Sequence, residues 1–344
     1  MKKILVAMSG GVDSAAACLL LRGQGYSVGG ATMLLRDGGE AEAQAAADTA
    51  RRLEMPFTCF DLRREFQENV IAPFARVYRQ GGTPNPCVVC NRTMKFGLFM
   101  QRALALGYDA IATGHYARLA LEQGRYLLKI AENRAKDQTY VLYALSQTQL
   151  AHALFPLGEV KDKQQARALV EQAGLPIAQK HDSQDICFVP DGDYLAYLTA
   201  HGLQPQTGNF LSTDGTVLGA HRGFEAYTIG QRRGLGMAFG ERAYVLEKRG
   251  SDVVVGAPEK LFSRRVLVES VSYLPFDTPP APLRVQTKLR YSARTAEALL
   301  TPTQNGCELL FDAPQRAVTN GQSAVFYLGE TLLGGGIICG RAEN

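Results

Sequence analysis

The segment Ser9-Gly-Gly-Val-Asp-Ser14 lies between the apolar runs Lys3–Met8 and Ala15–Leu21. This order predicts a buried strand that turns on two glycines into a helix. Glycines let backbone N–H groups approach a phosphate closely, and a helix N-terminus carries about half a positive charge. The chain has no G-x-x-x-x-G-K-[ST] sequence, which excludes the Walker loop. The segment therefore predicts an anion-binding loop of another kind near the start of the fold.

Ser9–Ser14 resembles the PP-loop of ATP pyrophosphatases, which cleave ATP between its α- and β-phosphates. The resemblance implies that ATP binds at this loop. From its place in the loop, Asp13 is a candidate Mg²⁺ ligand, since Mg²⁺ prefers carboxylate oxygens. An acidic residue in the first turn of a helix also serves as a helix cap, and both interpretations of Asp13 stay open.

Strand and helix patterns alternate through the first two hundred residues. The candidate strands are Lys3–Met8, Tyr26–Leu34, Pro56–Asp61 and Asp109–Thr113, and helical patterns occupy Ser14–Arg22, Glu40–Leu53, Arg64–Tyr78, Lys95–Leu106, Gln147–Phe155 and Lys163–Gly174. Such alternation predicts a parallel sheet with helices on both faces and ligands at the carboxyl ends of its strands. Met33 and Gly114, near two such ends, are therefore candidates for the nucleotide site.

Beyond about residue 205 the chain consists of short β-like runs separated by turn residues. These runs are Arg242–Lys248, Asp252–Val255, Arg265–Tyr273, Leu283–Leu289, Cys307–Phe311, Ser323–Tyr327 and Gly336–Cys339. Regular short strands of this kind predict a β-rich half that ends in a small barrel. We expect an α/β protein with an N-terminal parallel-sheet PP-loop domain (adenine nucleotide alpha hydrolase-like, residues 1–205), a small central domain (206–268) and a C-terminal β-barrel (269–344).

The composition indicates where in the cell the protein resides and what kind of partner it binds. No apolar run reaches the ~18 residues of a membrane span, and Met1-Lys2-Lys3 leads into a strand rather than a signal peptide. We therefore expect a cytoplasmic protein that does not associate with membranes. Between Arg222 and Arg294 thirteen Lys or Arg face seven Asp or Glu. This excess fits a solvated surface and also a phosphate-rich partner.

The seven cysteines are odd in number and irregularly spaced, which argues against a secreted disulfide framework. Thr83-Pro-Asn-Pro-Cys-Val-Val-Cys-Asn91 places a C-x-x-C just before a predicted helix, whose N-terminus is expected to lower the pKa of a thiol. No second C-x-x-C exists, which disfavours a four-cysteine zinc site. Cys187, between Ile186 and Phe188, resembles a core cysteine when taken alone.

Ordered blocks along the whole chain make the sequence similar to bacterial tRNA-specific 2-thiouridylases. The blocks are Ser9–Ser14, Thr83–Asn91, Ala112–Arg118, Lys136–Leu142, Ser183–Phe188, Tyr227–Arg232 with Gly234–Gly236, Arg290–Tyr291 and Gly321–Gln322. The resemblance implies ATP- and Mg²⁺-dependent 2-thiolation of the wobble uridine of tRNA, by adenylation of the C2 oxygen and sulfur transfer from a cysteine persulfide, with release of AMP and pyrophosphate. A cysteine desulfurase or a sulfur-relay protein would donate the sulfur. We expect the protein to act as a monomer.

The resemblance also implies a role for individual residues. Cys90 would be the nucleophile and Cys187 the persulfide carrier, with a Cys90–Cys187 disulfide as one product of turnover. Lys136 and Arg290 fit solvated charges equally well, and Tyr291 fits a barrel residue. Implied ATP-binding residues are Ala7, Met8, Ser9, Gly10, Gly11, Val12, Asp13, Ser14, Met33 and Gly114; implied base- or tRNA-binding residues are Asn85, Pro86, Cys87, His115, Lys136, Asp137, Gln138, Arg290, Tyr291 and Gln322.

One position departs from the family pattern, because many members have Asp where this chain has Cys87. That Asp is assigned an acid–base or base-positioning role, which a thiol does not fill in the same way. Two hypotheses stay open. Asp185 or a water takes over the proton transfer, or Cys87, Cys90 and Cys187 ligate a [4Fe–4S] cluster whose open iron carries the extra sulfur.

Three other classes of protein share part of this pattern. Other PP-loop enzymes, such as amidotransferase-type or lysidine synthetases, have the loop but do not need Cys90 and Cys187. A thiol–disulfide oxidoreductase has a C-x-x-C but no ATP loop. A non-catalytic RNA-binding protein would not need the intact Ser9–Ser14 motif. The combination of loop and cysteines favours the thiouridylase interpretation.

Overall fold

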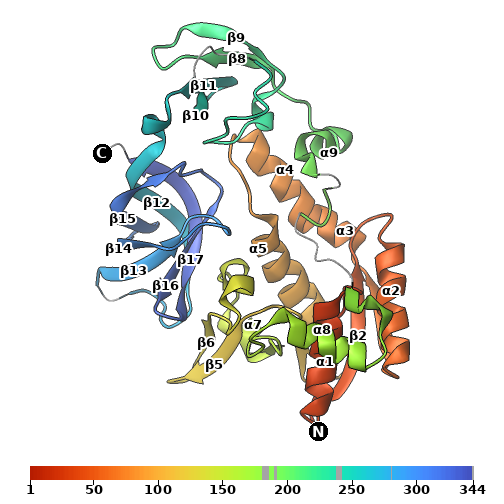
Figure 1. The fold of residues 1–344 in the computed structure, drawn as a ribbon. Coiled ribbons are helices and arrows are strands. Elements are labelled where there is room, and N and C mark those ends of the chain that lie inside the picture. Colours follow the sequence, from red (N-terminus) through yellow and green to blue (C-terminus); the bar gives the residue numbers. More distant parts are fainter. Residues whose placement is uncertain (180–185, 190–191, 238–241, 280, 343–344) are drawn as a thin grey trace.

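The computed structural model describes residues 1–179, 186–189, 192–237, 242–279 and 281–342, and Figure 1 shows its three parts. A helix-rich part contains the N-terminus, a small β-sheet lies above it, and a β-barrel lies beside both. The expected architecture, a parallel-sheet domain followed by a central domain and a C-terminal barrel, is confirmed. Within the described residues no helix combines the length and the apolarity that a membrane crossing requires.

The N-terminal sheet has five parallel strands in the order β3-β2-β1-β4-β7. The chain reverses direction across the sheet between β1 and β4, which makes the carboxyl ends of these two strands the switch point where ligands bind in open α/β sheets. The strands are β1 (Lys3–Ala7), β2 (Ser27–Leu34), β3 (Phe57–Asp61), β4 (Ala110–Ala112) and β7 (Ala153–Leu154).

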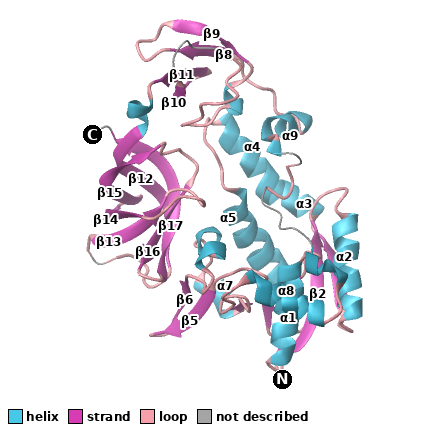
Figure 2. Cartoon of the chain, in the orientation of Figure 1, coloured by secondary structure: helices cyan, strands magenta, loops and turns pink. Residues whose placement is uncertain are grey.

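Helices cover both faces of this sheet, as expected (Figure 2). Ile4 and Val6 of β1 point into one core, which α1, α2 and α8 cover, whereas Leu5 points into a second core beneath two helical rods. The three covering helices are α1 (Val12–Gly23), α2 (Glu40–Arg52) and α8 (Lys163–Gln172). The rods are α3 (Arg63–Phe66), η1 (Gln67–Ile71) and α4 (Ala72–Arg79), and then α5 (Pro86–Cys90), η2 (Asn91–Phe99) and α6 (Met100–Ala105).

Each rod contains a π-helical stretch, η1 or η2. In the first rod, Pro73 follows the π-helical turn and cannot donate a backbone hydrogen bond, which disturbs the regular α-helical pattern. The second rod begins earlier than the predicted Lys95–Leu106, at Pro86, because proline suits the first helical position. The predicted helix Gln147–Phe155 was wrong in its second half, since α7 (Gln147–Ala151) ends there and the chain pairs with β4 as β7.

The central part is a four-stranded sheet in the order β10-β11-β8-β9. Its core contains Phe210, Tyr227, Val245 and Val253, and the helix α9 (Tyr194–Ala200) precedes it. The strands are β8 (Gly208–Leu211), β9 (Val217–His221), β10 (Tyr244–Arg249) and β11 (Asp252–Gly256), of which the sequence did not predict β8 and β9.

The C-terminal part is an antiparallel barrel of six strands, closed by pairing of β12 with β17. Its strands are β12 (Phe262–Tyr273), β13 (Leu283–Lys288), β14 (Ala296–Thr303), β15 (Gly306–Arg316), β16 (Ser323–Leu328) and β17 (Thr331–Ala342). β12 spans the expected boundary at residues 268 and 269, and the domain boundaries stay a prediction. The sequence did not predict β14.

A hairpin from the N-terminal half joins the barrel to the parallel-sheet domain. It consists of β5 (Arg118–Glu122) and β6 (Arg125–Lys129), and Lys129 pairs with Thr331 of β17. Arg125 Nε donates to the carbonyl oxygen of Leu274 at 2.8 Å. These contacts join the barrel to the hairpin that follows β4 in the chain. Short 3₁₀ helices complete the fold at Arg134–Lys136, Thr139–Val141, Pro176–Gln179, Phe224–Ala226 and Pro258–Leu261.

Candidate functional site

The Ser9–Ser14 loop forms the predicted strand-to-helix turn at the carboxyl end of β1. Gly10 has φ +68°, and a Cβ at this position would lie 3.0 Å from the Ala45 Cβ, so only glycine fits without strain. Gly11 is the N-cap of α1. The buried hydroxyl of Ser14 donates to the Gly11 carbonyl oxygen at 3.0 Å and accepts from Ser9 N–H at 3.3 Å. The loop is thus held in shape by its own residues, with a helix N-terminus behind it.

Gly114 lies against this loop from the neighbouring strand end. A Cβ on Gly114 would lie 3.0 Å from the Asp13 carbonyl carbon and 3.1 Å from Ser14 N. Ala31 of β2 pairs with Ala7 of β1. Met33, two residues further along β2, is half-buried. The three strand ends therefore meet at one edge of the sheet. Nucleotide binding by Ala7, Met8, Val12 and the other loop residues stays a prediction.

The carboxylate of Asp13 has two partners that the sequence did not suggest. Tyr116 Oη donates to Asp13 Oδ1 at 3.0 Å, and Lys163 Nζ donates to Oδ2 at 3.3 Å. The Lys163 side chain is 12% exposed. Tyr116 belongs to the Ala112–Arg118 block, which could have signalled it, but no local pattern connects Lys163 with a residue 150 positions away. Oxygen donors suit Mg²⁺, yet Asp13 as positioned already pairs with an ammonium, and its metal role stays a prediction.

Three cysteines lie near one another, Cys87 and Cys90 on α5 of the second rod and Cys187 in the 186–189 segment. Cys87 and Cys187 are exposed, Cys90 is 9% exposed, and all seven cysteines are free. Cys187 raises the pKa of Cys87, and both thiols raise the pKa of Cys90, as close like charges do. Phe188 anchors Cys187, because its ring packs against Phe66 at 5.5 Å between centroids.

The expected lowering of the thiol pKa was wrong. Burial raises the pKa of Cys90 to about 12. The surrounding protein also raises the pKa of Cys87 and of Cys187 by removing water from the thiols, although both residues keep exposed surface. α5 continues without a break into η2, so Cys90 lies inside the rod rather than at a free helix terminus. Removal of water from a thiolate therefore outweighs the helix dipole. The charge of Lys95 opposes this effect at all three thiols.

The described residues contain no group of three His, Cys, Asp or Glu arranged to hold a metal ion, and this applies to Cys87, Cys90 and Cys187. As positioned, the three thiols do not fit a [4Fe–4S] cluster. The other hypothesis for the missing Asp invoked Asp185, which lies outside the described residues together with Ser183 and Gln184.

The barrel holds the loop that leads into the cysteines. Gln322 Nε2 donates to the carbonyl oxygens of Thr83 at 2.9 Å and Pro84 at 3.4 Å. Asn85 is half-buried and Pro86 is buried at the start of α5. Tyr291, 49% exposed, lies close enough to Cys87 for the thiol to affect its pKa, and its hydroxyl donates to the Asp137 carbonyl oxygen at 3.4 Å. The exposed ring of Tyr291 thus lies beside the cysteines.

Several expected tRNA-binding side chains contact other parts of the protein instead of projecting freely. Arg290 donates to the carbonyl oxygens of Ile229 and Ala317 and to Thr319 Oγ1. Asp137 is 9% exposed, and burial raises the pKa of its carboxyl.

His115 is buried, shares a hydrogen bond with Thr113 Oγ1 at 2.8 Å, and has a pKa lowered well below its ordinary value by burial. Gln138 Oε1 accepts from Tyr116 N–H, and Lys136 is half-exposed. tRNA contact by all of these residues stays a prediction.

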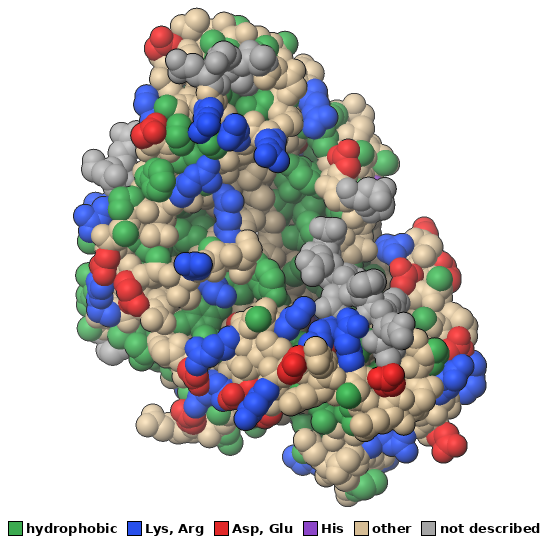
Figure 3. Space-filling model, in the orientation of Figure 1, with side chains coloured by type: hydrophobic (Ala, Val, Ile, Leu, Met, Phe, Trp, Pro, Cys, Tyr) green, Lys and Arg blue, Asp and Glu red, His purple; other side chains and the backbone are tan. Residues whose placement is uncertain are grey.

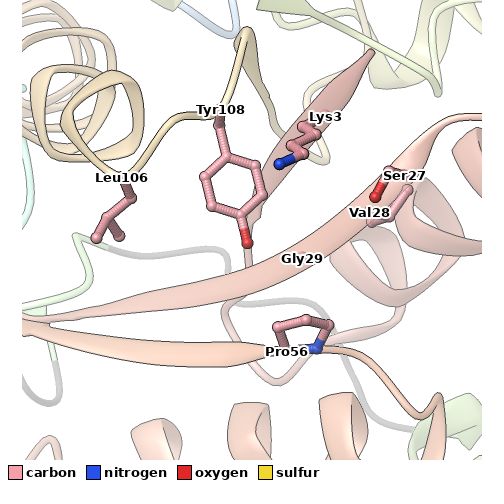
Figure 4. Close-up of a pocket in the computed structure, with 7 residues that line it drawn as sticks. All are labelled: Lys3, Ser27, Val28, Gly29, Pro56, Leu106 and Tyr108. Atoms are coloured by element: carbon pink, nitrogen blue, oxygen red, sulfur yellow. The ribbon is translucent and has the colours of Figure 1, made fainter. Parts of the chain in front are cut away.

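The surface of the molecule has a hollow and a separate pocket. Figure 3 shows Lys and Arg side chains around a hollow, partly lined by hydrophobic side chains, between the central sheet, the barrel and the parallel-sheet domain. A separate pocket, shown in Figure 4, lies at the opposite edge of the sheet, where Lys3 and Ser27 begin their strands. It is therefore remote from the candidate site. Its lining consists of Lys3, Ser27, Val28, Gly29, Pro56, Leu106 and Tyr108.

Comparisons with known proteins cover nearly the whole chain. Three family models match consecutive segments: the tRNA methyl transferase HUP domain at residues 2–191, the tRNA methyl transferase PRC-barrel domain at 196–256, and the aminomethyltransferase beta-barrel domain at 263–338. The tRNA-specific 2-thiouridylase MnmA 1 of Clostridium tetani is 44% identical over 98% of this chain and 96% of its own length.

A second relative has the same name. The tRNA-specific 2-thiouridylase MnmA 1 of Clostridium botulinum (strain Loch Maree) is 42% identical over 98% of this chain and 99% of its own length. Among solved structures, the NH₃-dependent NAD synthetase of Campylobacter jejuni shares 16% identity, with 53% of this chain and 69% of that chain covered and a TM-score of 0.34. That likeness is too low to carry an argument.

Proposed function

The chain belongs to the family of tRNA-specific 2-thiouridylases, and from this membership we propose that it is a tRNA sulfurtransferase that replaces the C2 oxygen of a tRNA uridine by sulfur at the expense of ATP. The observation that most strongly supports this proposal is the 44% identity to the Clostridium tetani relative over 98% of the chain. The co-occurrence of a phosphate-type loop with three neighbouring cysteines supports it, because thiolation needs both an activated oxygen and a sulfur carrier.

Activation of the uridine is assigned to the Ser9–Ser14 loop. Bound ATP supplies the adenylyl group that turns the C2 oxygen into a leaving group. The loop N–H groups and the N-terminus of α1 would hold the phosphates, and Gly114 would let the nucleotide approach the backbone. Lys163, positioned by Asp13, would face the negative charge of the departing pyrophosphate.

Sulfur transfer is assigned to Cys187 and Cys90. A persulfide donor would load Cys187, whose terminal sulfur attacks C2 of the uracil, so that a C–S bond forms and the C–O bond to AMP breaks. The Cys90 thiolate then attacks the Cys187 sulfur, the S–S bond breaks, and 2-thiouridine leaves. The resulting Cys90–Cys187 disulfide is returned to two thiols by a dithiol reductant. Alternatively, reduction by Cys90 releases sulfide, which attacks C2.

The target would be the wobble uridine, as the family resemblance implies. A base in the anticodon loop must leave its stack to reach the cysteines, and an exposed aromatic side chain beside them offers a surface for it. Tyr291 occupies this position next to Cys87. Basic side chains around the hollow would contact the tRNA phosphates.

The test is a reconstituted reaction with an unmodified tRNA transcript, Mg·ATP, cysteine and a cysteine desulfurase. Organomercury gels retard thiolated RNA but not methylated RNA, which separates sulfur transfer from the methyl transfer that the domain descriptions name. We expect a retarded band together with equal amounts of AMP and pyrophosphate. A transcript with cytidine at the wobble position is the control. Folded, ATP-binding protein that gives no retarded band would contradict the proposal.

A further inference from the structure

Lys95 lies on the same face of the second rod as two of the cysteines. In α5, Cys87 and Cys90 are three residues apart and therefore neighbours on the helix surface. η2 is π-helical, with bonds from each N–H to the fifth residue back, which turns Lys95 closer to the face of Cys90 than an α-helical turn would.

A glycine within η2 accommodates the wider π-helical turn. A Cβ on Gly97 would lie 3.0 Å from the carbonyl oxygen of Arg92, five residues earlier, a contact that a larger residue would have to relieve. π-helical turns inside helices occur often at functional sites, where they redirect a side chain. The side chain redirected here is the half-buried ammonium of Lys95.

The charges around Lys95 are unusual for a half-buried lysine. Among the described residues it makes no ion pair with an Asp or Glu, and the groups that its charge affects are Cys87, Cys90, Cys187 and His115.

Three other charged or titratable side chains lie near these thiols. Tyr291 lies near Cys87, and Tyr197 lies near Cys187. Arg36 also lies near Cys187 and is itself paired with Glu42 at 2.7 Å. A lysine placed among thiols rather than carboxylates has its full charge available to a sulfur anion.

We propose that Lys95 is a positioning residue of sulfur transfer, whose ammonium holds the thiolate and persulfide anions of Cys87, Cys90 and Cys187 in the site. The inference rests on the proposed function for the use of Cys90 and Cys187 as sulfur carriers. Each sulfur step needs an anion, and burial opposes its formation. Lys95 offsets that cost at all three sulfurs. Its neighbour His115 is buried and neutral, so no second cation competes for them from that side.

The test measures thiol reactivity directly, by alkylation with iodoacetamide across pH and peptide mass spectrometry. The variants are Lys95→Met, which removes the charge at similar length, and Lys95→Arg, which keeps it. The exposed thiols of Cys59 and Cys339 are internal references in the same protein, since the charges that affect them are Asp61 and Glu269.

In Lys95→Met we expect alkylation of Cys87 and Cys187 at pH 7 to slow about tenfold relative to these references, as the midpoint of the pH profile rises by about one unit. Lys95→Arg should stay within about threefold of the unchanged protein.

Equal relative rates in Lys95→Met and the unchanged protein would overturn the inference. So would an equal loss in Lys95→Met and Lys95→Arg, because the charge would not be the cause. If Lys95→Met does not fold, Lys95→Gln takes its place under the same criteria. Failure of the proposed function has a different signature, since the unchanged protein would then give no thiolated tRNA while Lys95→Met still slowed alkylation.

Discussion

The nucleotide loop and the cysteine site are built in opposite ways. The loop is one contiguous segment, Ser9–Ser14, whose shape is fixed by its own hydrogen bonds and whose carboxylate, Asp13, is paired with Lys163. The cysteine site combines residues from the second rod and the 186–189 segment, with Tyr291 of the barrel beside them. Burial raises the pKa of its most enclosed thiol, Cys90, instead of a helix dipole lowering it. The shape of the loop is thus fixed locally along the chain, whereas the cysteine site depends on contacts between distant segments.

The largest expected effect comes from removing the sulfur carriers. Cys90→Ser and Cys187→Ser should each lower tRNA thiolation at least about a thousandfold, because a hydroxyl can neither accept nor pass on sulfur. ATP affinity, measured by calorimetry, should not change, since the loop lies on other elements. Cys59→Ser, at an exposed thiol of β3, is the matched control and should keep full activity. Full thiolation by both variants would move the protein to another class of PP-loop enzyme.

The next effect tests whether the loop depends on its distant lysine. Lys163→Met should weaken ATP binding by about ten- to a hundredfold, the usual worth of a hydrogen bond to a charged group. Lys163→Arg should recover most of the affinity. The alkylation rates of Cys87 and Cys187 should stay the same in both variants. Unchanged ATP affinity in Lys163→Met would show that the pair with Asp13 serves the fold alone.

A smaller effect tests the close approach of Gly114 to the loop. Gly114→Ala places a Cβ 3.0 Å from the Asp13 backbone, which should cost about 1–3 kcal/mol of stability or shift the loop and weaken ATP binding about tenfold. Gly23→Ala is the matched control, because nothing lies within 4 Å of its Cβ. That variant should be neutral or slightly more stable in thermal unfolding. Equal stability and equal ATP affinity of the two variants would mean that the loop accommodates the added Cβ without cost.

The smallest expected effect concerns iron. Because the three cysteines are not arranged as metal ligands, chelator treatment of anaerobically purified protein should change thiolation less than about twofold, with far less than one iron per chain. Iron and acid-labile sulfide are measured on the same sample. About four irons per chain, with activity that tracks them, would contradict this expectation and make Cys87 a cluster ligand instead of a substitute for Asp.

The fold was predictable where hydrophobic pattern and local turns determine it. The strands β1 to β4 and most helices of the parallel-sheet domain followed from alternating apolar runs, whereas β7 did not, and the loop followed from two glycines before a helix. The hairpin β5–β6 was not predicted, because its role depends on pairing with β17 some two hundred residues later. α7 ended early because β4 offered hydrogen bonds to the following residues, a tertiary effect that helix periodicity does not contain.

The same distinction between sequence and tertiary structure applies to the candidate site. The sequence by itself determined the chemical groups, a phosphate-type loop and a set of cysteines, because residue identity and spacing fix which atoms are available. Only the tertiary structure decided their state. It placed Lys163 on Asp13, buried Cys90 so that its pKa rises to about 12, and turned Lys95 toward the thiols. Ionisation depends on water and on charges that lie nearby in space, and chain order does not specify either of them.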